Sequence, residues 1–145
     1  MHLRLISLML PLLGAICLAD DAADRTKIVG TWELDNGSGK TAWILEKTGD
    51  GLHFVYTHGA EKLADFQCST SGHECEVQIS GRACKVSLYY NGPGLEMLET
   101  RGDTVVRRRF RTASGGKEID VETASIVPDG KPETLRLKRA QAGGR

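Results

Sequence analysis

The sequence carries no excess of charge of either sign, because its 145 residues include 19 Lys and Arg against 19 Asp and Glu. A balanced chain has no general attraction for nucleic acid or for an anionic membrane. The sequence also lacks a Ser-His-Asp arrangement, a pair of catalytic carboxylates and a glycine-rich phosphate loop. With no such chemistry to assign, we expect a protein that is not an enzyme and uses no cofactor.

Long hydrophobic runs are scarce, and the single one lies at the start of the chain. Residues 5–18 read LISLMLPLLGAICL and follow the basic Arg4. Cys17 and Ala19 then supply the small side chains that a signal peptidase requires around its cleavage site. This pattern predicts a secretory signal peptide over residues 1–19, and hence a secreted or periplasmic protein.

Two alternatives to a cleaved signal fit the same run less well. A membrane anchor needs about 20 apolar residues, and Pro11 interrupts this shorter run. A lipid attached to Cys17 is disfavoured by the bulky Ile16 before it. We expect no stable membrane insertion after cleavage, and a flexible polar leader over residues 20–27.

A helical period is absent from the remaining sequence, which instead alternates short β-type runs with turn residues. Ten candidate strands follow one another at spacings of about 8–12 residues, as in antiparallel sandwiches and barrels. Closure into a barrel removes the unpaired edges of such a sheet. The predicted fold class is all-β: an antiparallel meander over residues 28–139 that closes into a barrel of about 8–10 strands, with a frayed tail at 140–145.

The turn residues predict which side chains oppose one another across two hairpins. Gly49-Asp50 and Gly102-Asp103 have the composition of hairpin tips, and large apolar cross-strand pairs stabilise one face of each hairpin. The opposed pairs are Leu45 with Phe54, Trp43 with Tyr56, Leu95 with Phe110, Met97 with Arg108, Glu99 with Val106, and, on the outer face, Glu96 with Arg109. Continued alternation adds Ala64, Phe66, Cys68, Cys75, Val77, Ile79, Cys84, Val86, Leu88, Tyr90, Ile119, Val121, Leu135 and Leu137 to the inner face.

Three stretches, GTWELD, YYNGPGLEMLETRGDTVVRRRF and IVPDGKPETLRLKR, carry a resemblance to a known family. Gly30-Thr31-Trp32 resembles the Gly-x-Trp motif on the first strand of lipocalin-like (calycin) barrels. The layout is similar to that of small exported bacterial lipocalin-like proteins of uncharacterised function. The resemblance implies a lumen that holds a small molecule. The sequence departs from the family in having no helix after the last strand and more candidate strands than the usual eight.

The same resemblance implies a partner for Trp32, because in lipocalins an arginine from the last strand region lies across the tryptophan ring. Arg139 shares the inward parity of Leu135 and Leu137, whereas Arg136 points outward. We therefore expect Arg139 to cover Trp32 and close one end of the barrel as a structural plug. A guanidinium over an indole contributes about 0.5–2 kcal/mol.

Three cysteines remain once the signal is removed: Cys68, Cys75 and Cys84. A loop centred between the first two places them directly opposite each other, within disulfide reach, and export exposes them to an oxidising compartment. We expect a Cys68–Cys75 bridge and an inward-facing thiol at Cys84. The alternative is a metal site that adds His73, but its C-x4-H-x-C spacing is not a standard zinc arrangement, so we expect no metal.

Two basic motifs can be explained by their place in the fold, without a binding role. The RGD tripeptide, Arg101–Asp103, falls at a hairpin tip, where Gly and Asp are common. In VVRRRFR, Arg107, Arg109 and Arg111 share one outward face with nearby acids. A phosphate-binding patch is uncompensated, so we expect no nucleic-acid partner.

Glu99 and Arg108 stand out because both fall on the apolar face, one diagonal step apart. A buried charge needs a partner, so the two side chains either pair, inside the barrel or at its mouth, or lie solvated at an open end. Both arrangements are compatible with the sequence. If the pair is buried, Arg108 could also receive the carboxylate of a ligand.

The function that we expect is binding of a small apolar or amphipathic molecule in the lumen. The proposed lining comprises Trp43, Phe54, Tyr56, Phe66, Met97, Glu99, Arg108 and Phe110. The alternative is a non-catalytic structural or protein-interaction module of the cell envelope or extracellular space, with a packed lumen. A cavity below about 300 Å³ would favour the alternative.

Overall fold

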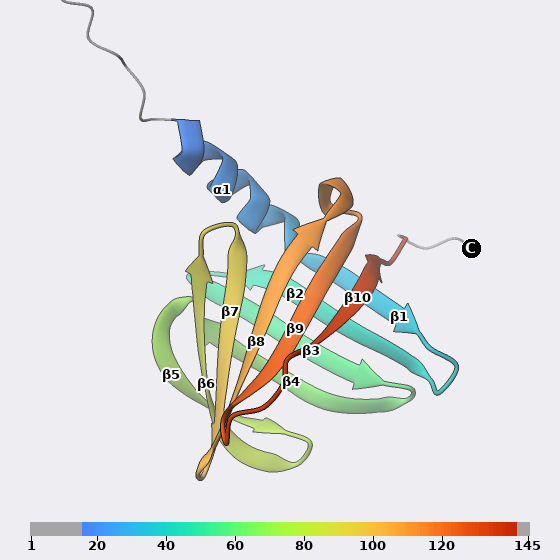
Figure 1. The fold of residues 1–145 in the computed structure, drawn as a ribbon, viewed down its shortest axis with the longest axis vertical. Helices are drawn as coiled ribbons and strands as arrows, with labels where there is room; N and C mark the ends of the chain where they lie inside the picture. The colour runs from blue at the N-terminus through green and yellow to red at the C-terminus, as the bar shows by residue number, and fades with distance from the viewer. Residues whose placement is uncertain (1–15, 142–145) are drawn as a thin grey trace, which may run out of the picture.

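The computed structural model describes residues 16–141 and contains a helix followed by a meander of ten strands (Figure 1). The elements are α1 (Ile16–Lys27), β1 (Gly30–Asp35), β2 (Lys40–Thr48), β3 (Gly51–His58), β4 (Glu61–Ser69), β5 (Ser71–Ile79), β6 (Arg82–Asn91), β7 (Gly94–Arg101), β8 (Thr104–Ala113), the short 3-10 helix η1 (Ser114–Gly116), β9 (Glu118–Val127) and β10 (Glu133–Arg139).

The strands form one closed antiparallel barrel in which each strand pairs with its neighbours in the chain and β1 pairs with β10. Figure 1 shows β7–β10 crossing in front of β1–β4, with the β5–β6 hairpin joining the two layers at one side. The predicted all-β meander barrel is therefore confirmed, and all ten strands belong to it.

Both predicted hairpin registers are confirmed. Gly49 and Gly102 have φ of 48° and 50°, the left-handed conformation that glycine adopts at little cost. These tips set the pairing of β2 with β3 and of β7 with β8 as the sequence predicted, including Trp43 opposite Tyr56 and Met97 opposite Arg108. Because a shift of one residue would turn every side chain to the other face, the inner face follows from these tips.

Arg139 lies over the ring of Trp32. The two residues oppose each other on β1 and β10, and the guanidinium carbon lies 4.2 Å from the centroid of the buried indole. Arg139 also donates hydrogen bonds to the carbonyls of Gly116 (2.8 Å), Val29 (2.9 Å) and Lys27 (2.6 Å). Arg139 at the end of β10 thus connects the segment between α1 and β1 with the short helix η1 before β9.

Gly30 is required by the same plug. Its φ is 147°, and a Cβ at this position would collide with the Arg139 guanidinium. The indole Nε1 of Trp32 donates to the Ile28 carbonyl at 2.9 Å, so the ring is held by its polar edge as well. Gly30 and Trp32 therefore lie on the same face of β1. The glycine leaves room for the Arg139 guanidinium, and the tryptophan ring packs beneath it.

We predict energetic coupling between Trp32 and Arg139. Trp32→Phe and Arg139→Met should each destabilise the domain, and the double variant should lose less than the sum by about 0.5–2 kcal/mol. Urea unfolding of the four proteins measures this term. Arg136→Met is the control, because Arg136 lies on the outer face against Asp120; strict additivity of Trp32 with Arg139, or coupling with Arg136, would contradict the plug.

The prediction of a flexible leader over residues 20–27 is wrong, because these residues form the last turns of α1. Arg25 anchors the helix: its Nε donates to the Gly92 carbonyl at 2.8 Å, and its guanidinium lies 5.1 Å from the Tyr90 ring centroid. Lys27 pairs with Asp24 at 2.7 Å, and basic residues in a last turn favour a helix through its dipole. Tertiary contacts thus stabilise a helix that shows no long apolar period.

The predicted signal peptide falls mostly on residues 1–15, which lie outside the described residues. Its expected cleavage point after Ala19 lies within α1. Within residues 16–141, no helix has the length and apolar character needed to cross a bilayer. The predicted tail at 140–145 begins with a hydrogen bond from the Ala140 N–H to the Thr31 carbonyl at 2.8 Å, and residues 142–145 lie outside the described part.

Candidate ligand-binding site

The aromatic residues predicted to line the lumen form a packed cluster on the inner faces of β2, β3, β4 and β8. Trp43 stacks on Tyr56 with ring centroids 4.2 Å apart and meets Phe110 edge-on at 5.4 Å. Phe54 meets Phe110 at 5.7 Å and stacks on Phe66 at 5.4 Å. All except Tyr56 are buried. The inward assignment of these side chains agrees with their burial, and the rings pack against one another.

Beside this cluster the inner face carries three charged side chains. Glu99 is buried, at 4% exposure, and its two carboxylate oxygens contact different arginines. Oε2 accepts a hydrogen bond from Arg108 Nη1 at 2.6 Å, and Oε1 lies 2.9 Å from Arg101 Nε. Both arginine side chains remain partly exposed, at 22% and 29%. The two side chains thus pair, with the carboxylate buried and both guanidiniums partly exposed.

Arg101 is the site residue that the sequence interpretation missed, because it was treated only as part of the RGD turn. It has the inward parity of Met97 and Glu99 on β7, so the alternation that placed Glu99 could have placed it as well. Its Nη2 donates to the Ile79 carbonyl at 3.2 Å. An arginine held inside by a carboxylate and a carbonyl is not presented for adhesion, which agrees with the turn interpretation of RGD.

The disulfide between Cys68 and Cys75 is confirmed, with Cα atoms 5.9 Å apart. Because this bond uses two of the candidate thiolates, the alternative metal site with His73 is not formed. Within residues 16–141, no group of three or more His, Cys, Asp and Glu side chains is arranged to hold a metal. The bridge instead joins the end of β4 to the middle of β5.

Cys84 is a buried free thiol next to the charged group. It lies opposite Val77 in the β5–β6 ladder. Burial raises the pKa of the thiol, the negative charge of Glu99 raises it further, and Arg101 opposes both effects. The thiol therefore stays protonated at neutral pH and acts as a small apolar neighbour of the Glu99–Arg101 pair.

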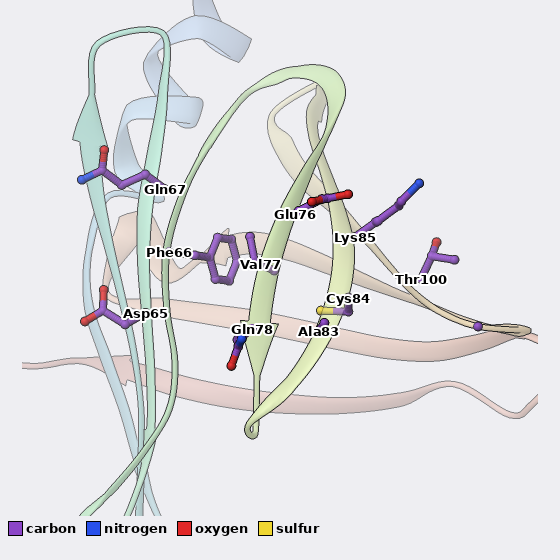
Figure 2. Close-up of a pocket in the computed structure, with 11 residues that line it drawn as sticks. Asp65, Phe66, Gln67, Glu76, Val77, Gln78, Ala83, Cys84, Lys85 and Thr100 are labelled. Atoms are coloured by element: carbon purple, nitrogen blue, oxygen red, sulfur yellow. The ribbon is translucent and has the colours of Figure 1, made fainter.

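The barrel wall is incomplete between β4 and β5. These strands share a single register pair, Ala64 with Ile79, and a pocket of about 910 Å³ lies along the seam. Figure 2 shows Phe66 and Val77 pointing toward each other across the gap, while Glu76 and Lys85 point away. The pocket thus joins the outer surface to inward-facing side chains, including Cys84. No sequence feature signals this gap, since the alternation of both strands is regular.

A row of four polar side chains lies on the outer face, from β2 to the β4 side of this gap: Glu46, His53, Asp65 and Lys62. His53 lies 2.7 Å from Asp65 through Nε2 and 3.1 Å from Glu46 through Nδ1, and Lys62 contacts Asp65 at 2.6 Å. The hydrogen bond to Asp65, followed by that to Glu46, raises the pKa of His53 above its ordinary value. Lys62 and then His53 lower the pKa of Asp65.

We predict that the His53 imidazole titrates above the ordinary pKa of about 6.5. Its raised pKa stabilises the fold at pH values below the ordinary pKa, and that contribution is lost as the pH rises through the folded-state pKa. NMR titration of the ring Cε1–H should show the shift. Asp65→Asn should lower the pKa of His53 more than Glu46→Gln does, and an equal pKa in all three proteins would contradict the network.

The arginine strip on the outer face is compensated by acids. Arg109 contacts Glu96 at 2.8 Å and Glu122 at 3.5 Å, and Arg107 lies 3.7 Å from Glu122. Glu96 is buried at 2% exposure although it faces outward, because the long arginine side chains cover this part of the sheet. The strip therefore does not form the uncompensated patch that phosphate binding requires.

Comparisons with known proteins identify the architecture. No family model matches the sequence, and no curated protein sequence matches it. Among solved structures, a Schistosoma mansoni fatty acid binding protein in complex with arachidonic acid has a TM-score of 0.69 at 11% identity, covering 81% of this chain and 99% of that one. A secretory abundant heat soluble protein of Ramazzottius varieornatus has a TM-score of 0.68 at 14% identity, covering 79% and 96%.

A mutant of the fluorescent protein UnaG is similar as well, with a TM-score of 0.64 at 15% identity, covering 81% of this chain and 99% of that one. Identities this low establish the fold alone. They agree with the calycin-type resemblance in the sequence, and the similar structures also include a REP1-NXSQ fatty acid transporter. The chain forms a closed, ten-stranded antiparallel barrel, which matches the calycin fold of the fatty-acid-binding-protein type.

Proposed function

We propose that this protein binds a small amphipathic molecule whose anionic head lies at Arg101 and Arg108. The observation that carries the proposal is the group of two arginines and one glutamate on an inner face that is otherwise largely apolar. The group has a surplus positive charge, and both guanidiniums keep partial access to solvent. A carboxylate would complete it through charge-assisted hydrogen bonds, and the apolar part of the molecule would contact neighbouring side chains such as Phe66 and Val77.

We also propose that the protein is exported, as the N-terminal sequence predicts, and that it acts without catalysis. The Cys68–Cys75 disulfide supports an oxidising compartment. Arg101 and Arg108 support binding rather than a reaction, because arginine stays protonated and cannot act as a base at physiological pH. The fatty-acid binding and transport proteins among the structural neighbours support the same class of function.

The test is a titration with cis-parinarate, a fatty acid that becomes fluorescent when it leaves water. The wild-type protein should bind it, and Arg108→Gln should weaken binding about tenfold or more, because a hydrogen bond to a charged group contributes about 1.5–3 kcal/mol. Arg136→Gln is the matched control, since Arg136 lies outside against Asp120 and its loss should leave binding unchanged. Equal affinities for the wild-type and Arg108→Gln proteins would contradict the arginine site.

The second candidate is the structural or protein-interaction module with a packed lumen. The observation in its favour is the mutual packing of Trp43, Phe54 and Phe110, which occupies the barrel at their level. If this candidate is correct, the fluorescence of cis-parinarate should not rise at any concentration of the folded wild-type protein.

A further inference from the structure

We infer that the ligand lies across the open end of the barrel and carries a hydroxyl group about ten carbons from its carboxylate. Arg101 and Arg108 hold the carboxylate, and His58 holds the hydroxyl group, with Thr41 as the residue that positions the imidazole. This inference rests on the proposed binding function and names the ligand class, a medium-chain hydroxy acid. It adds a second polar contact on the wall of the barrel that faces the arginines.

The barrel interior is open to solvent at the end where the odd-numbered strands finish and the even-numbered strands begin. Inward-facing side chains at this end, which we call the mouth, are exposed or partly exposed: Leu34, Tyr56, His58, Arg108, Thr123 and Leu135. Toward the opposite end, inward-facing side chains are at most 1% exposed: Trp32, Leu45, Leu52, Leu95, Ile119 and Leu137. A ligand therefore meets the polar groups of the inner face at the mouth.

Aromatic rings form the floor of the mouth. Trp43 on β2 and Phe110 on β8 meet with ring centroids 5.4 Å apart, although β2 and β8 are not neighbours in the barrel. Their contact therefore spans the interior, and Tyr56 stacks on Trp43 beside it. An apolar chain that lies across the mouth contacts these rings along its length.

Polar groups lie on facing walls, one inward step from this floor. Arg108 is two residues from Phe110 in the direction of the mouth. Thr41 is two residues from Trp43 in the same direction, and its Oγ1 is 3.1 Å from Nδ1 of His58. Since inward side chains recur every second residue, the arginine and the Thr41–His58 pair lie at a similar height. The mouth thus has an anionic-group site on one wall and a neutral polar site on the other.

His58 is suited to hold a hydroxyl group. Its Nδ1 contacts the hydroxyl of Thr41, which is 6% exposed, whereas Nε2 has no hydrogen-bond partner within residues 16–141. A Cβ on Gly39 would lie 3.5 Å from Nε2, so the glycine keeps this side of the ring open. Nε2 donates in one tautomer and accepts in the other, and a hydroxyl group can do both. One carboxylate already balances the surplus charge of the arginines, so the second group is neutral.

The width of the mouth sets the distance between the two polar groups of the ligand. Facing β-layers lie about 10 Å apart, and three bonds of an extended chain advance about 3.5 Å. About nine bonds therefore span the mouth, which is the separation of carbons 1 and 10 in a straight-chain acid. 10-Hydroxydecanoate has this spacing, whereas 2-hydroxydecanoate carries the same hydroxyl group next to its carboxylate.

The experiment measures displacement of cis-parinarate by decanoate, 10-hydroxydecanoate and 2-hydroxydecanoate. The wild-type protein should bind 10-hydroxydecanoate about fivefold more tightly than decanoate, the gain from one typical hydrogen bond. His58→Phe should abolish this preference while the protein still binds decanoate. His53→Phe is the matched control, because His53 lies on the same strand but contacts Glu46 and Asp65 on the outer face. It should retain the preference of the wild type.

The wild-type protein supplies a second measurement in case His58→Phe does not fold. In NMR spectra the Cε1–H resonance of His58 should move on saturation with 10-hydroxydecanoate and much less with decanoate. Equal preferences in the wild-type and His58→Phe proteins, an equal gain from 2-hydroxydecanoate, or a His58 resonance that responds alike to both acids would overturn the inference. Binding of decanoate without any preference for the hydroxyl group would leave the proposed function standing, whereas a wild-type protein that binds no parinarate would refute both.

Discussion

Trp43→Ala should destabilise the barrel by about 3–5 kcal/mol, the usual cost of truncating a packed core aromatic. The ring is 6% exposed and contacts Tyr56, Phe54 and Phe110. Its removal leaves a void that three large neighbours on different strands cannot fill together. Urea unfolding with linear extrapolation measures the change, and the midpoint should fall without a change in slope.

Ile126→Ala is the matched control for this prediction, because Ile126 is a large apolar residue at 40% exposure on β9. Its truncation should change stability by about 0.5 kcal/mol or less. A loss below about 1 kcal/mol for Trp43→Ala would mean that the ring does not lie in a packed core.

Glu99→Gln should destabilise the protein by about 3 kcal/mol, the lower end of the cost of removing one partner from a buried ion pair. The lower end applies because Arg101 and Arg108 keep partial solvent access. The glutamine amide can accept one hydrogen bond but cannot neutralise two guanidiniums. Glu133→Gln, the same change at an exposed position of β10, should leave the urea midpoint unchanged.

The same substitution should tighten binding of a carboxylate while it weakens the fold. Without Glu99, the ligand head no longer competes with a resident carboxylate, so the affinity for cis-parinarate should rise and that for the corresponding alcohol should not. Such an exchange of stability for binding is typical of functional groups that are buried at a cost. Equal stability of wild-type and Glu99→Gln proteins would show that the ion pair is solvated. An unchanged affinity for cis-parinarate would show that the ion pair does not belong to the binding site.

The strand registers could be predicted from the sequence because two local signals agree in each hairpin. At Gly49-Asp50 and Gly102-Asp103 the tip residues set the pairing, and the alternation of apolar side chains independently selects the same pairing. The disulfide was predicted from the register of its loop and an oxidising compartment, and the Trp32–Arg139 contact from the family resemblance, with parity selecting Arg139 over Arg136. These features depend on a two-residue period, which holds without a register shift in the β2–β3 and β7–β8 pairs.

The helix and the gap between β4 and β5 depend on contacts that no local pattern encodes. Residues 20–27 have few apolar side chains, and their helix is anchored by Arg25 on Gly92 and Tyr90, which lie far along the chain. The gap between β4 and β5 arises although both strands alternate normally, since Ala64 and Ile79 form the one register pair that the two strands share. The inward position of Arg101 could have been predicted from the alternation of β7. The residue also belongs to the RGD turn motif, and the turn interpretation was preferred.

The pairing of β1 with β10 determines when the protein can fold. The hydrogen bond from Arg139 to the Val29 carbonyl spans 110 positions of the chain, and Trp32 stays uncovered until Arg139 has been synthesised. Contacts at such separation form late and slowly, so a nascent chain leaves the ribosome with its barrel open. The strand that completes the wall thus delays closure of the barrel until β10 has been synthesised, and under the proposed export this leaves an open chain that a translocation channel can thread.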